Sequence, residues 1–296
     1  MTDRRVSSIV AIVVAMAAWS AQAQDAPQTN ELFRRHYVEG QQLQYLMRAE
    51  NNGNKYQVRI TATTKRRDDG RFVEELAWHE LESNGKARPL SPAAEAFRLE
   101  VTLDGGQPFV MPDLSKAPGL VGPVLDLLSF YSDQFLAIHQ SSLRQRGDRV
   151  VVPIDLVPSW ADGVNVILGE DHVHFDVTLT NVDVEARRAM LLVKHVPPAE
   201  PKIRIPAEWM RTPVAGTPNN WVQIRKRANR FEASVGRETF DVELTIDTAD
   251  GSIVSATMDN PVTAITRDCA DEVLSDCGDA RATPTLRRIE MTRTDR

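Results

Sequence analysis

The sequence holds only two cysteines among its 296 residues, and aromatic residues make up just 6% of it. It has no excess of positive charge: the formal net charge is −6, which argues against nucleic acid as a partner. The low cysteine content excludes a disulfide-rich scaffold. Hydrophobic residues at 42% and charged residues at 26% exclude intrinsic disorder and indicate a globular protein.

The signatures of common enzyme classes are missing as well. There is no G-x-S-x-G, no H-E-x-x-H, no G-x-x-x-x-G-K and no G-x-G-x-x-G. No later segment approaches the roughly 18 continuous apolar residues of a transmembrane helix. The sequence therefore favours a binding or assembly protein over an enzyme, and it leaves the activity open.

A secretory leader is expected over residues 1–23. Arg4 and Arg5 precede an uncharged apolar run over Ile9–Trp19, and Ala21-Gln22-Ala23 is a small-x-small cleavage site. Cleavage near Ala23 would start the mature chain at Gln24 and leave a net charge of −7. We expect a periplasmic or secreted protein without a lipid anchor, because the first residue after the cleavage site, where lipidation needs a cysteine, is Gln24.

The two cysteines, Cys269 and Cys277, are eight positions apart and are expected to form a disulfide in an oxidising compartment. A straight helix would hold them about 12 Å apart, farther than the roughly 7 Å that a disulfide tolerates. The bond therefore requires the chain between residues 268 and 279 to turn back on itself. Acidic neighbours would raise the thiol pKa, which favours a structural role over a redox role.

Alternating apolar residues and short turns predict a chain made mostly of strands. A short helix is expected over 31–38, followed by strands at 41–50, 56–64, 72–81 and 97–103. Further strands are expected at 150–154, 172–180, 189–196, 221–227, 230–234, 238–246, 253–258 and 285–292.

One substantial helix is predicted between these two groups of strands. Apolar residues recur at helical spacing from Val124 to Ile138, and the helix is expected from Pro123 to Gln140 or Arg144. It either packs on the sheet as core or plugs a cavity. In the second case Tyr131 and Phe135 would contact a ligand.

The expected fold is mainly β. A large curved antiparallel sheet, half-barrel or barrel-like, would pack on the central helix in one domain over residues 24–296. The alternative is two β subdomains divided near Gly147.

Three histidines fall in one predicted hairpin and are candidate metal ligands. His172 and His174 share a face of their strand, and a turn centred between Asp183 and Val184 would place His195 opposite His172. Three imidazoles suit zinc or copper. A slip of one residue in the pairing would instead turn His195 to the other face.

A proline-rich excursion over residues 197–218 is the second candidate site. It carries Trp209 and Met210, and an exposed aromatic beside a flexible methionine suits an apolar binding surface. The same residues would equally pin the loop onto the core.

In the order of its expected elements, half of the chain looks like exported carriers with a curved antiparallel sheet wrapped on a helix, such as the periplasmic lipoprotein carriers. No specific residue carries this resemblance. It implies a non-enzymatic protein that binds an apolar or amphiphilic ligand, or a partner at the envelope. The alternatives are a metal-binding protein or metal-dependent hydrolase that uses the three histidines, and a structural or assembly protein.

Overall fold

The computed structural model describes the chain from residue 29 to residue 295. The described part leaves out positions 52, 106–108, 111, 116, 156–158, 162–164, 169–171 and 197–204. At some further strand positions the backbone alone is described, namely 153–155, 159–161, 165–168, 172–174, 196 and 283–285. The predicted leader and its cleavage near Ala23 lie outside the described residues.

Strands dominate the described part of the chain and join in one sheet, in which every pairing is antiparallel. The strands are β1 Gln42–Asn51, β2 Asn54–Arg66, β3 Phe72–Ser83, β4 Lys86–Ala87, β5 Leu99–Val101, β6 Arg149–Asp155, β7 Ser159–Ala161, β8 Asn165–Leu168, β9 His172–Asp183, β10 Arg188–Val196, β11 Trp221–Arg227, β12 Arg230–Glu238, β13 Asp241–Asp247, β14 Ile253–Cys269 and β15 Arg281–Arg293. The helices are α1 Pro92–Ala96 and α2 Val121–Ile138, with short 3-10 helices η1 Pro118–Leu120 and η2 Glu208–Arg211.

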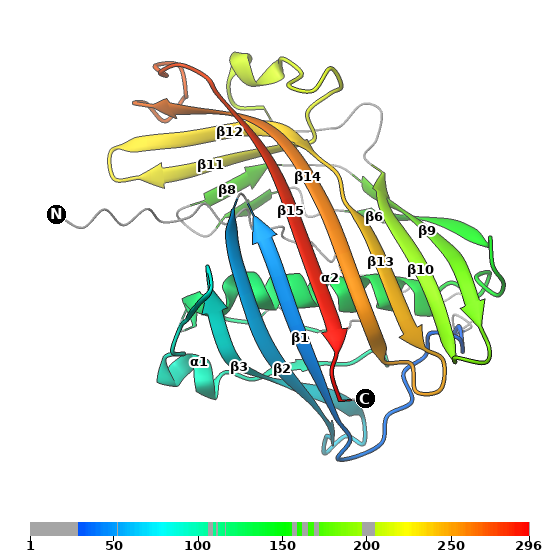
Figure 1. Ribbon diagram of the computed structural model, residues 1–296. Helices are drawn as coiled ribbons and strands as arrows, with labels where there is room; N and C mark the ends of the chain where they lie inside the picture. The colour runs from blue at the N-terminus through cyan, green and yellow to red at the C-terminus, as the bar shows by residue number, and fades with distance from the viewer. Residues whose placement is uncertain are drawn as a thin grey trace.

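The sheet forks at its longest strand, β14. Its unforked part runs in the order β4-β3-β2-β1-β15-β14. The first half of β14 then pairs with β13, which leads to β10, β9 and β6, and we call this the β13 branch. The second half pairs with β12, which leads to β11, β8 and β7, and we call this the β12 branch. Segments from before and after Gly147 thus share one sheet (Figure 1).

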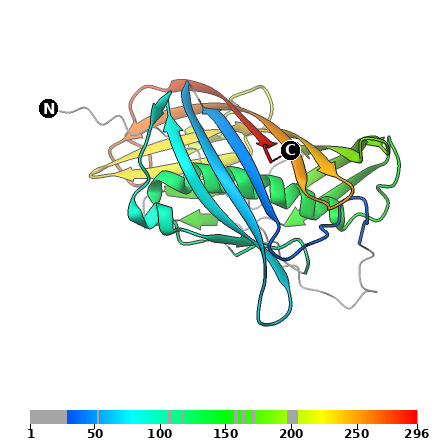
Figure 2. The same ribbon diagram turned by 60° about the horizontal axis from the view of Figure 1, so that its bottom comes forward.

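The sheet curves around α2 without closing, so the predicted half-barrel on one long helix is confirmed (Figure 2). Of the residues of α2, only Val121, Gly122 and Leu125 are not buried. Even so, the helix carries Asp126 and Asp133 in its middle. Among the described residues, no helix combines the length and the hydropathy that a membrane span requires.

The main core lies between α2 and the concave face of the sheet. It contains a buried ion pair between Arg35 and Glu74. Arg35 Nε donates to Glu74 Oε1 over 2.7 Å, and the Tyr131 hydroxyl donates to Glu74 Oε2 over 2.6 Å. Burial, together with the Glu74 carboxylate, raises the pKa of Tyr131, so that its hydroxyl stays protonated. The pair is therefore satisfied by hydrogen bonds on both carboxylate oxygens.

The expected helix over 31–38 is wrong, because residues 31–33 form a turn and the chain then extends along the end of α2. The Asn30 side chain donates to the carbonyls of Gln140 and Leu143, which fixes the start of this segment. Phe33 is fully buried in the main core. A side chain at Gly251 would overlap the backbone of this segment, so the glycine permits the close approach.

A second, smaller core lies on the convex side of the β12 branch. Val222, Ala233 and Val235 are buried there beneath Met210 and the chain around Cys269. The sulfur atoms of Cys269 and Cys277 lie 2.01 Å apart, at disulfide distance, and the two Cα atoms are 4.0 Å apart. The chain turns back between them, as the sequence predicted.

Candidate functional site

The four residues predicted to contact a ligand lie in two separate cores. Tyr131 and Phe135 are buried on α2 in the main core, where Phe135 contacts the His139 ring with 4.3 Å between ring centroids. Met210 is fully buried in the second core. The structure therefore does not bring the two pairs together.

Trp209 and Met210 hold the excursion onto the β12 branch. The Trp209 indole N–H donates to the Leu274 carbonyl over 3.2 Å, inside the loop that the disulfide closes. The Arg267 guanidinium lies 5.0 Å from the centre of the Trp209 ring. These contacts give both residues a packing role, the other interpretation that the sequence left open.

The expected pairing of His172 with His195 is wrong. His195 lies opposite Phe175, and Val196 lies opposite His174. The turn is centred two residues later than expected, since Asp183 lies opposite Arg188, and a bulge between Met190 and Leu191 shifts the register by one residue. Because adjacent positions of a strand alternate between faces, His195 shares a face with Phe175 and not with the position of His174.

Zinc or copper at His172, His174 and His195 stays a prediction, because the first two side chains lie outside the described residues. Where side chains are described, no group of three or more His, Cys, Asp or Glu is placed to hold a metal ion.

The concave face of the sheet instead carries a row of residues above α2. The His195 backbone N–H donates to the Phe240 carbonyl, and Asn260 lies opposite Arg287. The pairs that flank the bend between β12 and β13 set Phe240 opposite Asn260. Directly opposed residues share a face, so these four side chains form one row, which we call the interior row.

Arg287 anchors one end of the interior row to the helix. Its guanidinium pairs with the Asp126 carboxylate of α2, which also accepts a hydrogen bond from the Tyr56 hydroxyl. The side chains of Arg287 and Asp126 are 8% and 1% exposed. The α2 face that carries Asp126 therefore points toward the interior row.

Glu238 lies beside the middle of the row. Asn260 Nδ2 donates to Glu238 Oε1 over 3.1 Å. Burial raises the pKa of Glu238 to about 7, although the hydrogen bond from Asn260 acts in the opposite direction. This carboxyl therefore keeps its proton to a higher pH than an ordinary glutamate.

Aromatic rings form the other end of the row. The rings of His195 and Phe240 are stacked with 4.6 Å between centroids, and Phe175 lies 6.0 Å from Phe240. Burial, with a contribution from the charge of Arg237, lowers the pKa of His195 to about 4. His195 is thus a neutral ring at neutral pH. Trp221 of β11 lies opposite Gly236 and faces the same side of the sheet as Glu238.

Eight buried side-chain polar atoms have no hydrogen-bond partner among the described residues. They include His195 Nδ1 in the interior row, Trp221 Nε1 on the same face of the sheet and Asp133 Oδ2 on α2. Asp133 follows Asp126 by two helical turns, so both lie on the same face of α2. Next to Asp133, Gln134 Nε2 donates to the carbonyls of Phe33 and Gly251, so this part of α2 lies near the turn between β13 and β14.

Burial raises the pKa of Asp133 well above its ordinary value, and its residue is only 4% exposed. Buried polar groups are nearly always hydrogen-bonded, so the atoms of His195 and Trp221 on this face of the sheet need an explanation. They suit a molecule that brings its own donors and acceptors.

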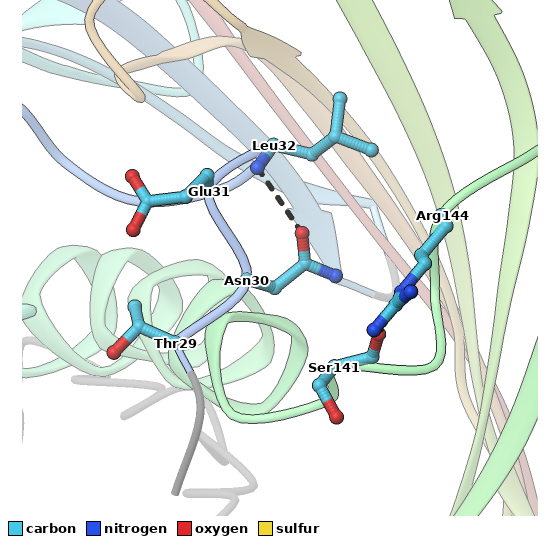
Figure 3. Close-up of a pocket in the computed structure, with 6 residues that line it drawn as sticks. All are labelled: Thr29, Asn30, Glu31, Leu32, Ser141 and Arg144. Atoms are coloured by element: carbon cyan, nitrogen blue, oxygen red, sulfur yellow. Dashed lines mark hydrogen bonds between the residues drawn. The ribbon is translucent and has the colours of Figure 1, made fainter.

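An open pocket also lies at the end of α2, with a volume of about 370 Å³ (Figure 3). It is lined by Thr29, Asn30, Glu31, Leu32, Ser141 and Arg144. The polar groups of Asn30 are already used: its Oδ1 accepts from the Leu32 N–H, and its Nδ2 holds the end of α2. None of the six residues has a buried polar atom without a partner. The pocket therefore has less to offer a ligand than the interior row.

Comparison with models of protein families, with curated proteins and with solved structures gave no match. The functional argument therefore depends on the chemistry of the site itself.

The sequence held one signal of this site. Asp126 interrupts the apolar pattern of the predicted helix. Its partner Arg287 is far away along the chain, as are Asn260 and Glu238, so sequence reasoning missed these three residues.

Proposed function

We propose that the protein is exported and that it binds a small amphiphilic molecule at the interior row. Export is supported by the predicted leader and by the disulfide, which is typical of oxidising compartments. Ligand binding is supported by one observation above the others: His195 and Trp221, on the concave face of the sheet, each bury a polar atom that has no partner among the described residues.

The chemistry of the region suits an amphiphile. Binding sites for small molecules are mostly apolar, with a few polar groups that fix the orientation of the ligand. Here the rings of Phe175 and Phe240 supply the apolar surface. The unpartnered atoms and Glu238 supply the polar contacts. Ordered water is the competing occupant, because water also satisfies buried polar groups.

Native mass spectrometry of the full chain expressed with its leader and purified from the periplasm tests this proposal. We expect a chain that starts at Gln24, with an added mass of several hundred daltons that is lost on denaturation. A bare chain would contradict ligand binding. Recovery only as the uncleaved cytoplasmic chain would contradict export.

Two matched tryptophan variants locate the ligand. Trp221→Phe removes an indole N–H that has no partner among the described residues, so the bound mass should fall while stability stays unchanged. Trp209→Phe removes an indole N–H that bonds the Leu274 carbonyl, so stability should fall while the bound mass stays. Equal ligand retention by both variants would place the ligand away from Trp221.

A further inference from the structure

Two of the unpartnered atoms flank the bend between β12 and β13 on the concave face of the sheet. Trp221 lies opposite Gly236, just before the bend. The His195 backbone N–H donates to the Phe240 carbonyl, just after it. Glu238 lies between these two positions, two residues from each. Trp221 Nε1 and His195 Nδ1 thus stand on either side of Glu238.

The protein fixes the backbone at the bend and leaves polar side-chain groups unused. Asn220 accepts from the backbone N–H of Glu238 and donates to its carbonyl. The Glu238 carboxyl accepts from Asn260 at Oε1, and its other oxygen has no hydrogen bond among the described residues. Trp221 and Glu238 are diagonal neighbours across the β11–β12 pair, a placement that keeps long side chains within reach of each other. The indole N–H and the carboxyl therefore offer one polar position.

Aromatic rings occupy the other side of the bend. The rings of His195 and Phe240 are stacked, and Phe175 lies 6.0 Å from Phe240. Trp221, His195 and Phe240 are only half-buried, so part of each side chain is still open to solvent. A molecule that spans the bend would meet polar groups at Trp221 and Glu238 and apolar surface at the rings.

Hydrogen-bond roles and charges at the bend favour an uncharged head. An indole N–H only donates, so its partner must supply an acceptor, which an ammonium group does not have. An anion would accept from Trp221, but Arg287 of the interior row is already paired with Asp126. A buried charge without a counter-charge costs free energy.

We infer that the bound amphiphile carries an uncharged head, a hydroxyl or an amide, which accepts a hydrogen bond from Trp221 and contacts the Glu238 carboxyl, while its apolar tail lies along Phe240 and Phe175. This inference rests on the proposed function and names the class and the orientation of its ligand. A hydroxyl or an amide also donates, so it satisfies whichever oxygen the carboxyl presents.

Isothermal titration with octanol, octylammonium and octanoate tests the inference on mature chain whose bare mass has been confirmed. The titration is done at pH 6, below the pKa of about 7 of Glu238, so that the carboxyl offers an ammonium ion no counter-charge. We expect octanol to bind at least about tenfold more tightly than either ion, because each ion would bury its charge alone. Tighter binding of either ion would overturn the inference and leave the proposed function standing.

Binding of none of the three compounds would also overturn the inference. The mass carried by the protein as purified, which is measured separately, then decides whether the proposed function falls with it.

Trp221→Phe is the decisive variant, because it keeps an aromatic ring and removes the donor. Octanol affinity should fall about fivefold, which corresponds to the loss of one hydrogen bond, and octylammonium should bind as it does to wild type. Trp209→Phe is the matched control and should leave both affinities unchanged, since its indole N–H bonds the Leu274 carbonyl in the second core. Unchanged octanol binding by Trp221→Phe would overturn the placement of the head. Thermal melts of both variants confirm that they are folded.

Discussion

Several charged side chains lie in parts of the protein that are otherwise apolar. The hydrogen bonds and counter-charges that each one receives depend on its neighbours. Arg35 and Glu74 have side chains that are 1% and 3% exposed, yet both are held by hydrogen bonds. Arg59 and Glu80 form a pair of similar length with side chains that are 48% and 70% exposed. The two pairs should contribute very differently to stability.

Glu74→Gln is expected to lower the free energy of unfolding by about 3–5 kcal/mol, because it leaves the Arg35 charge buried without a counter-charge. Glu80→Gln is the control and should cost less than about 1 kcal/mol, because water screens its partner Arg59. Urea denaturation of the three proteins measures both values. Equal losses in the free energy of unfolding would show that burial does not make the Arg35–Glu74 pair more important than the exposed pair.

Glu238→Gln should change how stability depends on pH. The pKa of Glu238 is raised from 4.5 to about 7, so the folded state holds this proton more tightly than the unfolded state. Wild-type stability therefore falls as pH rises from about 4.5 through 7, and the glutamine variant escapes this loss. We expect the variant to be more stable by about 1–3 kcal/mol at pH 8 and equal to wild type at pH 4. Thermal melts across this range check it, and parallel profiles would contradict it.

At the scale of elements, local patterns predicted most strands and failed where pairing depends on distant segments. β11 has the predicted bounds, Trp221–Arg227. The predicted strand over 253–258 continues to Cys269 as β14, although Pro261 suggests an end. The Pro261 carbonyl accepts from Thr239, so its missing N–H faces the fork between β12 and β13. A single sequence does not show the fork, and so it does not show that Pro261 can lie inside a strand there.

The expected register of the β9–β10 hairpin was wrong for a similar reason. The bulge between Met190 and Leu191 has no glycine to mark it, and the apolar run there does not alternate. The expected pairing of His172 with His195 was therefore wrong, and the residues of the interior row are found only when distant strands are paired.

Removal of the disulfide is expected to loosen only the loop that it closes and the segment around Trp209 that packs on this loop. Cys269→Ser with Cys277→Ser should lower the free energy of unfolding by about 2–3 kcal/mol, because the closed loop is short. The loop also supplies the Leu274 carbonyl that Trp209 bonds, so the excursion should loosen with it. Hydrogen exchange should rise around Leu274 and Trp209 and stay unchanged in α2. Faster exchange throughout α2 would mean that the bond supports the whole fold.

At the scale of the whole molecule, the fork of the sheet at β14 determines whether the chain unfolds as one unit or as two. The main core joins Phe33 near the start of the described chain to Met291 near its end. The second core is small and lies on the opposite face of the sheet. Because β14 pairs with both branches, the unfolding of β14 removes a sheet partner from each of them.

We therefore expect the mature chain to unfold in one cooperative transition. Two variants that each keep a single tryptophan report on the two cores: Trp78, which is 1% exposed in the main core, and Trp209 on the second core. Their fluorescence midpoints in urea should coincide, because the loss of β14 pairing removes both cores together. An earlier midpoint for Trp209 would show that the β12 branch is a separate unit. In that case the interior row, which borders both branches, would open without global unfolding and give a ligand its route of entry.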